Sequence, residues 1–268
     1  MKPSKLFKIN TPVFIIFGLC AIFLPIIIKT KSIGSLISPI ALFIVIGGVF
    51  CATCVAFSLK RIIRAFCSLK NLFSKREEAE LNTMAQELVE MAKVARSRGV
   101  EELADYIPNV KNSFIKLALP YLLSQPDITR LEDELRFLNY LCNKEDYENS
   151  EIFEEMGGYA PTFGMLGAIA GLIQITSMNT DPNALLSGIA TAFVATLYGV
   201  ASANLIFLPL AKKIRNNIDK SIITGEIALT LLLDIAQGQS SVVISEKLDR
   251  FFEMNNISRK GKVLKFAA

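Results

Sequence analysis

The polar side chains available at depth in the last two apolar segments of this sequence are chiefly hydroxyls, with an amide at Asn204. They are Thr162, Thr176, Ser187, Thr191, Thr196, Tyr198, Ser202 and Asn204. The same segments contain no Asp, Glu, Lys or Arg, the residues that usually mark a proton relay or an ion site at membrane depth. If the chain takes part in ion-driven work, the ionisable carboxylate must therefore come from another polypeptide.

Other kinds of chemistry are excluded by residue type. The 268 residues include no His and five Cys, which removes Ser-His-Asp triads, Cys-His nucleophiles and nearly all zinc sites. Carboxylates of the polar segments have no accompanying nucleophile, Gly-rich phosphate loop or metal-ligand spacing, so we expect no enzyme, metal or cofactor. Cys51 and Cys54 form a C-x-x-C in an apolar segment and are interpreted as free thiols that act as small hydrophobes. A net charge of +4 does not indicate nucleic-acid binding.

The apolar segments themselves indicate a membrane protein. Hydrophobic residues make up 51% of the chain, and the mean hydropathy is +0.41. The long runs without a charged residue are Ile9 to Ile28, Ser32 to Leu59, Met156 to Thr180 and Pro182 to Ala211. Because about 20 apolar residues cross a hydrocarbon core, each run predicts one transmembrane helix.

The distribution of basic residues predicts the orientation of these helices. Lysines and arginines flank the first span, follow the second and follow the fourth, at Lys2, Lys5, Lys8, Lys60, Arg61, Arg64, Lys212, Lys213 and Arg215. Lys29 and Lys31, between the first two spans, argue mildly for the opposite orientation. Since basic loops stay inside, we expect a multi-pass membrane protein with both termini in the cytoplasm.

The predicted fold is all-α, a polytopic membrane protein with four transmembrane helices and a helical cytoplasmic insertion. Its domains are expected at 1–59 (spans one and two), 60–155 (insertion), 156–211 (spans three and four) and 212–268 (tail). The insertion has a negative net charge and the tail a positive one. This difference indicates either that the two pack together or that each has a balanced, solvated surface.

Helical periodicity recurs in the polar segments. Apolar residues from Leu81 to Ala95 predict one amphipathic helix that ends before Gly99, and those from Ile128 to Cys142 predict a second. The pattern allows this second helix to continue into the third span. In the tail, Ile214, Ile218 and Ile222 continue the fourth span, and Val243, Leu248, Phe251 and Phe252 predict a terminal helix. Pro108, Pro120 and Pro126 are expected to break the middle of the insertion.

Small residues distinguish the last two spans from the first two, which are rich in Phe, Ile and Leu. They recur every four residues at Ala160, Gly164 and Ala168, at Gly167 and Gly171, and at Thr191, Ala195, Gly199 and Ala203. This spacing lets helix backbones approach closely in lipid. It fits both a tight four-helix monomer and a ring of subunits whose third and fourth helices line a shared centre.

Several motifs of the last two spans closely resemble the flagellar motor stator A-subunit family, MotA and PomA, within the wider MotA/TolQ/ExbB superfamily. They are GGYAPT, GMLGAIAGLI, NTDP, GIATAFVATLYG and NLIFLPLA, all between Gly157 and Ala211. The rest of the chain resembles this family in architecture, because two early spans, an insertion, two late spans and a basic tail follow one another. ExbB and TolQ have a single early span.

The resemblance implies an ion pathway formed by Thr196, Pro161, Pro209, Ala168 and Tyr198. The prolines match those that shape the helices beside the path, and Thr196 matches the hydroxyl that faces the partner's carboxylate. An ordinary kink at each proline, and a Thr196 hydroxyl bonded to its own helix, are the simpler interpretations. Ala168 stands where sodium-driven relatives tend to have Thr, so protons are the favoured coupling ion and sodium is the alternative.

The segment MAKVARSRGVEEL resembles the rotor-facing part of the family. Arg96 takes the place of its basic contact residue, although a solvated helix face explains an arginine here equally well. The family has Glu eight residues later, where this chain has Ala104. Glu101, Glu102 and Asp105 surround that position and are the candidates for the acidic rotor contact.

The function implied by the resemblance is that of an ion-driven stator subunit. A homopentamer would surround a dimer of a single-span B-subunit with a membrane Asp and a peptidoglycan-binding domain, and would transmit torque to the flagellar rotor switch protein. One alternative is a MotA-like motor subunit that energises gliding, envelope transport or antiphage defence. Another is a passive scaffold for partner helices in the lipid membrane.

Overall fold

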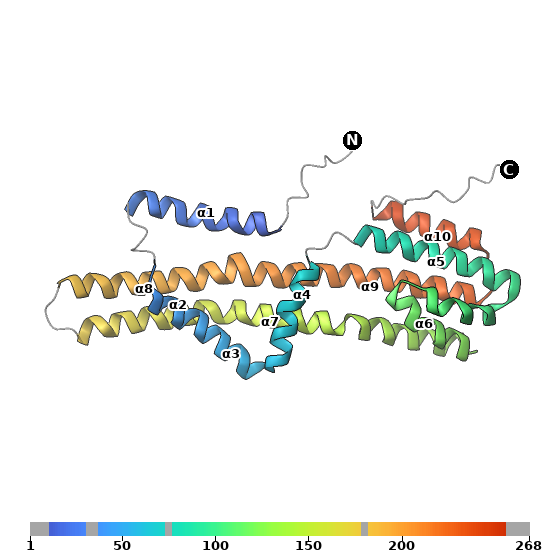
Figure 1. The fold of residues 1–268 in the computed structure, drawn as a ribbon, viewed down its shortest axis with the longest axis horizontal. Helices are drawn as coiled ribbons and strands as arrows, with labels where there is room; N and C mark the ends of the chain where they lie inside the picture. The colour runs from blue at the N-terminus through green and yellow to red at the C-terminus, as the bar shows by residue number, and fades with distance from the viewer. Residues whose placement is uncertain (1–10, 31–36, 73–76, 178–181, 256–268) are drawn as a thin grey trace. The chain divides into compact units, whose positions relative to one another are not determined.

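The computed structural model describes residues 11–30, 37–72, 77–177 and 182–255. Lys2, Lys5, Lys8 and Lys31, and the turn that carries Asp181, lie outside the described residues. The chain divides into two compact units. We call them the span unit (Met1–Phe73 and Asp146–Asn216) and the insertion unit (Ser74–Glu145 and Asn217–Ala268). Two long helices, α7 and α9, contribute residues to both (Figure 1).

All regular elements of the described residues are helices, which confirms the all-α fold class. In chain order they are α1 (Thr11–Thr30), α2 (Pro39–Leu42), the π-helix η3 (Phe43–Gly47), α3 (Gly48–Ala56), α4 (Leu59–Leu72), α5 (Glu77–Arg98), the 3₁₀-helix η4 (Val100–Asn109), α6 (Ser113–Ser124), α7 (Ile128–Ser177), α8 (Pro182–Ser202), the π-helix η5 (Ala203–Phe207), α9 (Leu208–Ala236) and α10 (Ser241–Met254).

Three helical stretches of the described residues are long and apolar enough to cross a membrane: Pro39–Ala56, Ile128–Thr176 and Gly188–Ala236. The first predicted span corresponds to α1, which is 20 residues long and contains Pro25. Its stretch Val13–Lys29 is apolar but shorter than the other three. The chain is therefore a polytopic membrane protein, and four as the number of spans stays a prediction.

The second span is shorter than the predicted run Ser32 to Leu59. Its helix begins after Ser38, whose hydroxyl accepts a hydrogen bond from the backbone N–H of Ala41 at 3.3 Å. It ends at Ala56, because Phe57 has an extended backbone. An uncharged run in the sequence could not reveal this helix end, because Phe57 and Ser58 beyond it are also uncharged.

The structure adds one helix that the sequence analysis treated only as a basic flank, α4. Ile62 and Ala65 on one side of α4 are fully buried, whereas Lys60, Arg61 and Arg64 are exposed. The ring of Phe66 packs edge-on against that of Phe153 of α7, with centroids 5.2 Å apart. The signal was present as apolar residues three apart within a basic stretch.

The helix α7 confirms that the second helix of the insertion continues into the third span. It runs for 50 residues without interruption and contains Pro161. The predicted break at Pro126 is confirmed, because α6 ends at Ser124 and α7 begins at Ile128. The predicted break at Pro120 is wrong: Pro120 lies inside α6, where four buried neighbours, Ile115, Ala118, Leu119 and Leu122, hold the helix in the core.

The insertion and the tail pack together, which was the first of the two interpretations of their opposite net charges. In the insertion unit α5, α6, the first part of α7, the last part of α9 and α10 enclose one apolar core, which includes Leu88, Leu119, Leu135, Leu232 and Phe252. The cause of the packing is this buried apolar surface. The net charges explain less, because ion pairs of both senses join the two segments: Arg136 of the insertion pairs with Glu226 of the tail, and Arg215 of the tail pairs with Glu154 of the insertion.

We expect Leu232→Ala to destabilise the insertion unit. Leu232 is fully buried at the centre of the core, so its truncation should cost about 2 to 5 kcal/mol through lost burial and a residual cavity. Thermal unfolding of the purified full-length protein should show a lower midpoint. Leu117→Ala, at an exposed position of α6, is the matched control and should leave the midpoint nearly unchanged. Equal midpoints for both variants would contradict the central position of Leu232.

Basic residues that flank the second and fourth spans are paired with acidic residues of α7. Arg61 lies 2.8 Å from Glu148, and Arg215 lies 2.8 Å from Glu154 and over the ring of Tyr147. Both pairs belong to the span unit. Arg61 comes shortly after the second span in sequence, and Arg215 shortly after the fourth. They fix α4 and the start of α9 against α7 at that level.

Candidate functional site

The two late spans cross at a point where neither helix has a side chain. A Cβ atom on Gly199 of α8 would lie 2.5 Å from the carbonyl oxygen of Ala160 and 2.9 Å from the Cα atom of Gly164. A Cβ on Gly164 of α7 would lie 3.1 Å from the carbonyl oxygen of Ala195. Because these neighbours are backbone atoms, a side chain at Gly199 would force the two helices apart, and one at Gly164 would be tight against α8.

The close approach continues along the same helices toward the other end of α8. A Cβ on Gly171 would lie 2.9 Å from the carbonyl oxygen of Gly188, and a Cβ on Gly167 would lie 2.7 Å from the methyl group of Ala195. The predicted small-residue stripes thus meet each other within one chain. This confirms close backbone packing of α7 and α8, and it accounts for the stripes without a second copy.

Thr196 lies next to this crossing and is half-buried. Its hydroxyl donates to the carbonyl oxygen of Ala192, one turn earlier, at 3.2 Å. Its Cα atom is 3.3 Å from where a Cβ of Gly164 would stand. A hydroxyl has one hydrogen and two lone pairs. The oxygen of Thr196 can therefore still accept a hydrogen bond, but its single hydrogen already has a partner.

Ala168 and Tyr198 occupy different surroundings. Ala168 is half-buried and follows Gly164 by one turn, so it shares the α7 face that meets α8. Tyr198 packs against the cluster of Ala41, Val45, Val194 and Ala195, where α8 meets the second span. Residues two apart lie on different faces of a helix, so the structure does not bring Tyr198 beside Thr196. The spacing of the two residues already separates them, but the sequence alone could not show that Tyr198 packs against the second span.

The two prolines differ in how their helices accommodate them. Pro161 lies inside α7 without a change of helix type. Pro209 follows the π-helix η5, in which the N–H of Leu208 bonds to the carbonyl oxygen of Ala203, five residues back. A π turn is a common response to a missing hydrogen bond and occurs often at functional sites. A departure from regular α-helix thus accompanies Pro209, and none accompanies Pro161.

Of the candidates for rotor binding, Arg96 is exposed in the last turn of α5. Its guanidinium donates to the carbonyl oxygen of Gly238, between α9 and α10, at 3.5 Å. The helix ends as predicted at Gly99, whose φ of +99° is a conformation that favours glycine. Glu101, Glu102 and Asp105 follow on η4 and are all exposed. Position 104, where the acidic residue is missing, is an exposed alanine on the same short helix.

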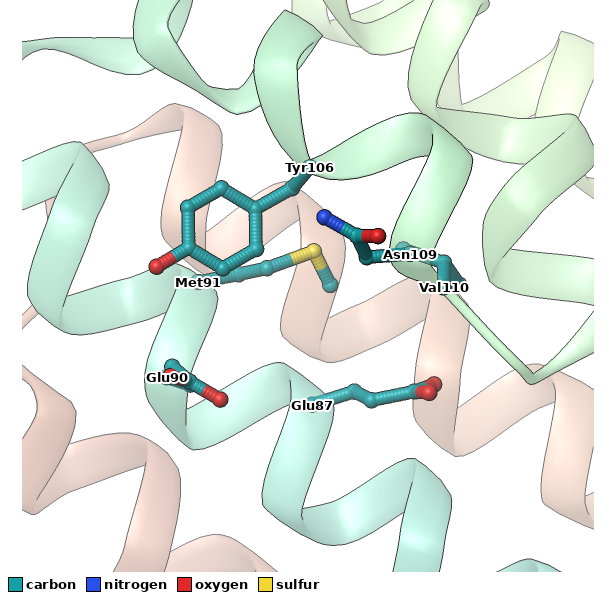
Figure 2. Close-up of a pocket in the computed structure, with 6 residues that line it drawn as sticks. All are labelled: Glu87, Glu90, Met91, Tyr106, Asn109 and Val110. Atoms are coloured by element: carbon teal, nitrogen blue, oxygen red, sulfur yellow. The ribbon is translucent and has the colours of Figure 1, made fainter.

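A pocket of about 300 Å³, which the sequence pattern does not predict, lies between α5 and η4. Figure 2 shows Glu87 and Glu90 of α5 on one side and Tyr106 and Asn109 of η4 on the other. The carboxylate of Glu87 accepts hydrogen bonds from the backbone N–H groups of Lys111 and Asn112, at 2.7 and 3.2 Å. It therefore holds the chain that enters α6. Two glutamates three residues apart on one helix were the available signal.

Two polar groups of the insertion unit have displaced pKa values. The hydrogen bond with Glu132, followed by the charge of Glu226, raises the pKa of Arg136, which therefore stays charged at all physiological pH values. Partial burial raises the pKa of the Cys142 thiol and so lowers its thiolate fraction.

Cys51 and Cys54 lie in α3 as free thiols. No group of three or more metal-binding side chains occurs within the described ranges.

Comparison with known proteins gives a consistent result. Residues 108–226 match the model of the MotA/TolQ/ExbB proton channel family. Motility protein A of Bacillus subtilis is 28% identical over 234 residues, which is 87% of this chain and 87% of that protein. The flagellar MotAB stator complex from Bacillus subtilis matches with a TM-score of 0.76 and 26% identity, over 90% of this chain and 96% of the matched chain. The C. jejuni MotAB structure matches in fold, with a TM-score of 0.80 at 23% identity, over 96% of this chain and 98% of that one.

Proposed function

Because the chain belongs to the MotA/TolQ/ExbB proton channel family, we propose that it is the A-subunit of a proton-driven flagellar motor stator. Its similarity to the flagellar MotAB stator complex from Bacillus subtilis supports an assembly of A-subunits with a B-subunit partner. We infer that this assembly is a homopentamer around a dimer of B-subunits. Each B-subunit contributes one span with a membrane Asp and a peptidoglycan-binding domain. The A-subunit has no enzymatic activity of its own in this proposal.

The observation that carries the proposal is the α7–α8 crossing with Thr196 beside it. The two helices meet through glycines, and the neighbouring hydroxyl has already donated its hydrogen to Ala192. Its oxygen can accept a hydrogen bond from a protonated carboxylic acid without loss of the bond to Ala192, whereas a carboxylate would have to compete with Ala192 for the single hydrogen. Such a site distinguishes the two protonation states of a partner's Asp, which is the property that a proton-driven step requires.

The energy for the step comes from proton movement down the membrane potential, which releases about 2.3 kcal/mol per 100 mV. Protonation changes which A-subunit face the B-subunit Asp prefers. A pentamer cannot match a dimer at every interface, so each change of preference turns the ring. Sodium is the alternative coupling ion, but Ala168 offers no oxygen to replace its water.

We place the stator subunit in the bacterial inner membrane with both termini in the cytoplasm. Segment 1–59 supplies the first two spans, 60–155 faces the rotor, 156–211 forms the ion-pathway module, and 212–268 is the tail. Pro161, Pro209 and Tyr198 are assigned to that module together with Thr196 and Ala168. The rotor switch protein contacts Arg96 and the acidic group Glu101, Glu102 and Asp105, all of which are exposed.

The rotor contact predicts the effect of Arg96→Ala. Motility should fall strongly, because the variant removes a positive charge from the surface that meets the rotor, and Arg96→Lys should retain part of it. Swimming speed and membrane levels of the protein are the measurements. The hydrogen bond to Gly238 is long, so its loss should not reduce the protein level. Arg98→Ala, in the same exposed turn, is the matched control. Normal swimming of Arg96→Ala would remove this residue from the rotor contact.

The function itself is tested by complementation. The gene for this chain, together with that of its B-subunit, is introduced into the source strain after deletion of both. Restored rotation that stops when a protonophore collapses the proton gradient is expected. Rotation that persists after collapse of the gradient would contradict the proposal, and no rotation with a correctly assembled complex would favour the passive scaffold.

A further inference from the structure

We propose that Asn139 and Gly225 form a register lock between α7 and α9, which lets these two helices transmit force as one body. This lock lies in the insertion unit and rests on the proposed motor function. Its positioning residues belong neither to the ion pathway nor to the predicted rotor contact.

The lock consists of a buried side-chain amide of α7 that fits into a notch of α9, the space left where a glycine has no side chain. Asn139 of α7 is 3% exposed, and its amide nitrogen donates to the carbonyl oxygen of Ile222 at 3.2 Å and to Glu226 at 3.4 Å. The notch is Gly225 of α9. A Cβ there would lie 2.8 Å from the amide nitrogen of Asn139 and closer still to its other amide atoms.

Two neighbours hold the amide in place. Asn143, one turn further along α7, donates from its own amide to the backbone oxygen of Asn139 at 2.8 Å and to its side-chain oxygen at 3.3 Å. One turn before Asn139, Arg136 reaches Glu226 at 2.7 Å and also pairs with Glu132 at 2.8 Å. Arg136, Asn139 and Asn143 are spaced by three and four residues and therefore share one face of α7.

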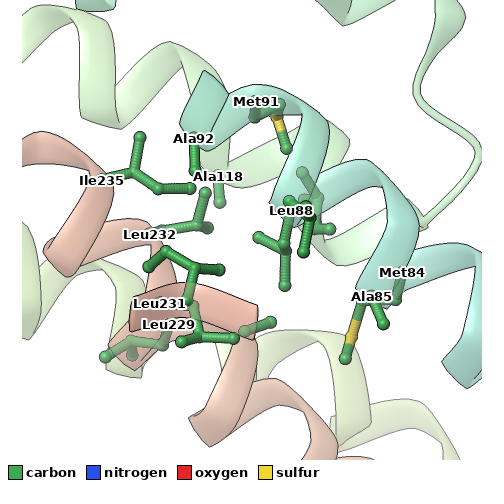
Figure 3. Close-up of a cluster of buried hydrophobic side chains, with 14 of the residues drawn as sticks. Met84, Ala85, Leu88, Met91, Ala92, Ala118, Leu229, Leu231, Leu232 and Ile235 are labelled. Atoms are coloured by element: carbon green, nitrogen blue, oxygen red, sulfur yellow. The ribbon is translucent and has the colours of Figure 1, made fainter. Parts of the chain in front are cut away.

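Apart from polar contacts such as the ion pair of Lys247 with Asp234 between α10 and α9, the other main helices of the insertion unit meet largely through apolar side chains. Figure 3 shows that apolar side chains of α5 and α9, among them Leu88, Met91, Leu231 and Leu232, fill the space between them. Apolar burial is non-directional, so it resists separation of helices more than sliding of one along the other. A buried amide with defined partners is a well-attested way to specify register.

Among the described residues, two helices can carry force from the span unit into the insertion unit. The described helices α7 and α9 pass into it from the span unit as continuous helices. If the ring turns, the two helices must move together, because relative sliding would dissipate the work of the step. The lock joins them at the level where both have just entered the insertion unit, at residues 139 and 222–226.

The test measures torque per stator unit with Asn139→Leu, which keeps the bulk in the notch but removes the hydrogen bonds. A bead on a flagellar stub, under high load, shows stepwise rises in torque as units engage. We expect smaller rises than in the wild type, with normal membrane levels and normal proton flux through the complex. At low load, where little force crosses the helices, the speed should be close to that of the wild type.

Gly225→Ala supplies a second, steric test. Its methyl group should displace the Asn139 amide and give the same small torque rises. In Asn139→Ala/Gly225→Ala the methyl groups no longer meet the amide, so the protein level should recover relative to Gly225→Ala while the torque rises stay small. Asn217→Ala, at an exposed position of α9, is the matched control and should resemble the wild type.

Two results would overturn the lock. Torque rises of normal height in Asn139→Leu would show that the amide does not transmit force. Fewer rises of normal height would show a purely structural role, because only the number of assembled units would have changed. Failure of the wild-type chain to drive any rotation would instead reject the proposed function, so the two failures are distinguishable.

Discussion

Thr196→Val is expected to abolish motility while the complex still assembles in the membrane. Valine has nearly the shape of threonine, so the packing beside the α7–α8 crossing should survive. The hydrogen bond to Ala192 is local to α8, and its loss leaves an ordinary helix turn. What disappears is the oxygen that could accept a hydrogen bond from a protonated carboxylic acid. The coupling between protonation and movement should therefore be lost.

Thr196 is tested by measuring swimming together with the amount of complex purified from membranes. Thr196→Ser keeps the oxygen and should retain motility. Thr176→Val is the matched control, because its hydroxyl also donates to its own helix, to Ile173 at 2.8 Å, but lies on an exposed face of α7. Normal swimming of Thr196→Val would remove this residue from the mechanism. Loss of the complex itself would show that the hydroxyl is needed for assembly.

Gly199→Ala is expected to prevent stable assembly, although it adds a single methyl group. The new Cβ would stand 2.5 Å from the carbonyl oxygen of Ala160 and 2.9 Å from the Cα atom of Gly164. These are backbone atoms, so no side chain can rotate away and the two helices must separate. Overpacking of a well-packed contact costs about 1 to 3 kcal/mol. Here the separation would also weaken the contacts of Gly167 and Gly171 further along the same helices.

The yield and thermal stability of the detergent-purified complex measure this effect. Gly158→Ala provides a matched control in α7, because no atom lies within 4 Å of the position that its Cβ would take. The control should assemble like the wild type, or slightly better, since alanine favours the helix over glycine. Equal yields of the two variants would contradict the close crossing.

Much of the fold could be predicted from periodicity and from the absence of charge. The end of α5 at Gly99, the continuity of α7 and the terminal helix α10 all follow the apolar pattern of the sequence. These features are local, because a helix needs only its own residues and a cap. The pairing of Gly164 with Gly199 was also accessible, since both belong to small-residue stripes of adjacent spans.

The errors arise where tertiary contacts outweigh local preference. Pro120 would end an isolated helix, but the core contacts of Leu119 and Leu122 maintain α6 around it. The extended residue Phe57 ends the second span inside an uncharged run, because apolar composition reports burial in lipid and not backbone conformation. The π turns have no composition signal that differs from that of an α-helix.

The candidate site was predictable in residue type but not in geometry. The resemblance supplied Thr196, and the structure supplies the acceptor of its hydrogen and its position at the glycine crossing. Tyr198 turned out to face the second span, because Ala41 and Val45 provide the complementary surface there. Such a choice between helix faces depends on the neighbouring helix, which the sequence of α8 does not contain.

The π turn at Ala203–Phe207 has a consequence for how the fourth span is aligned with other sequences. A π turn holds one residue more than an α-turn, and one residue corresponds to about 100° of rotation around a helix axis. A regular helical wheel drawn from Pro182 onward therefore misplaces each residue after Phe207 by that angle. Leu210 and Ile214 are buried, yet such a wheel would assign them a wrong direction relative to Thr196. Alignments of this region should accordingly allow a single-residue gap within 203–207, ahead of Pro209.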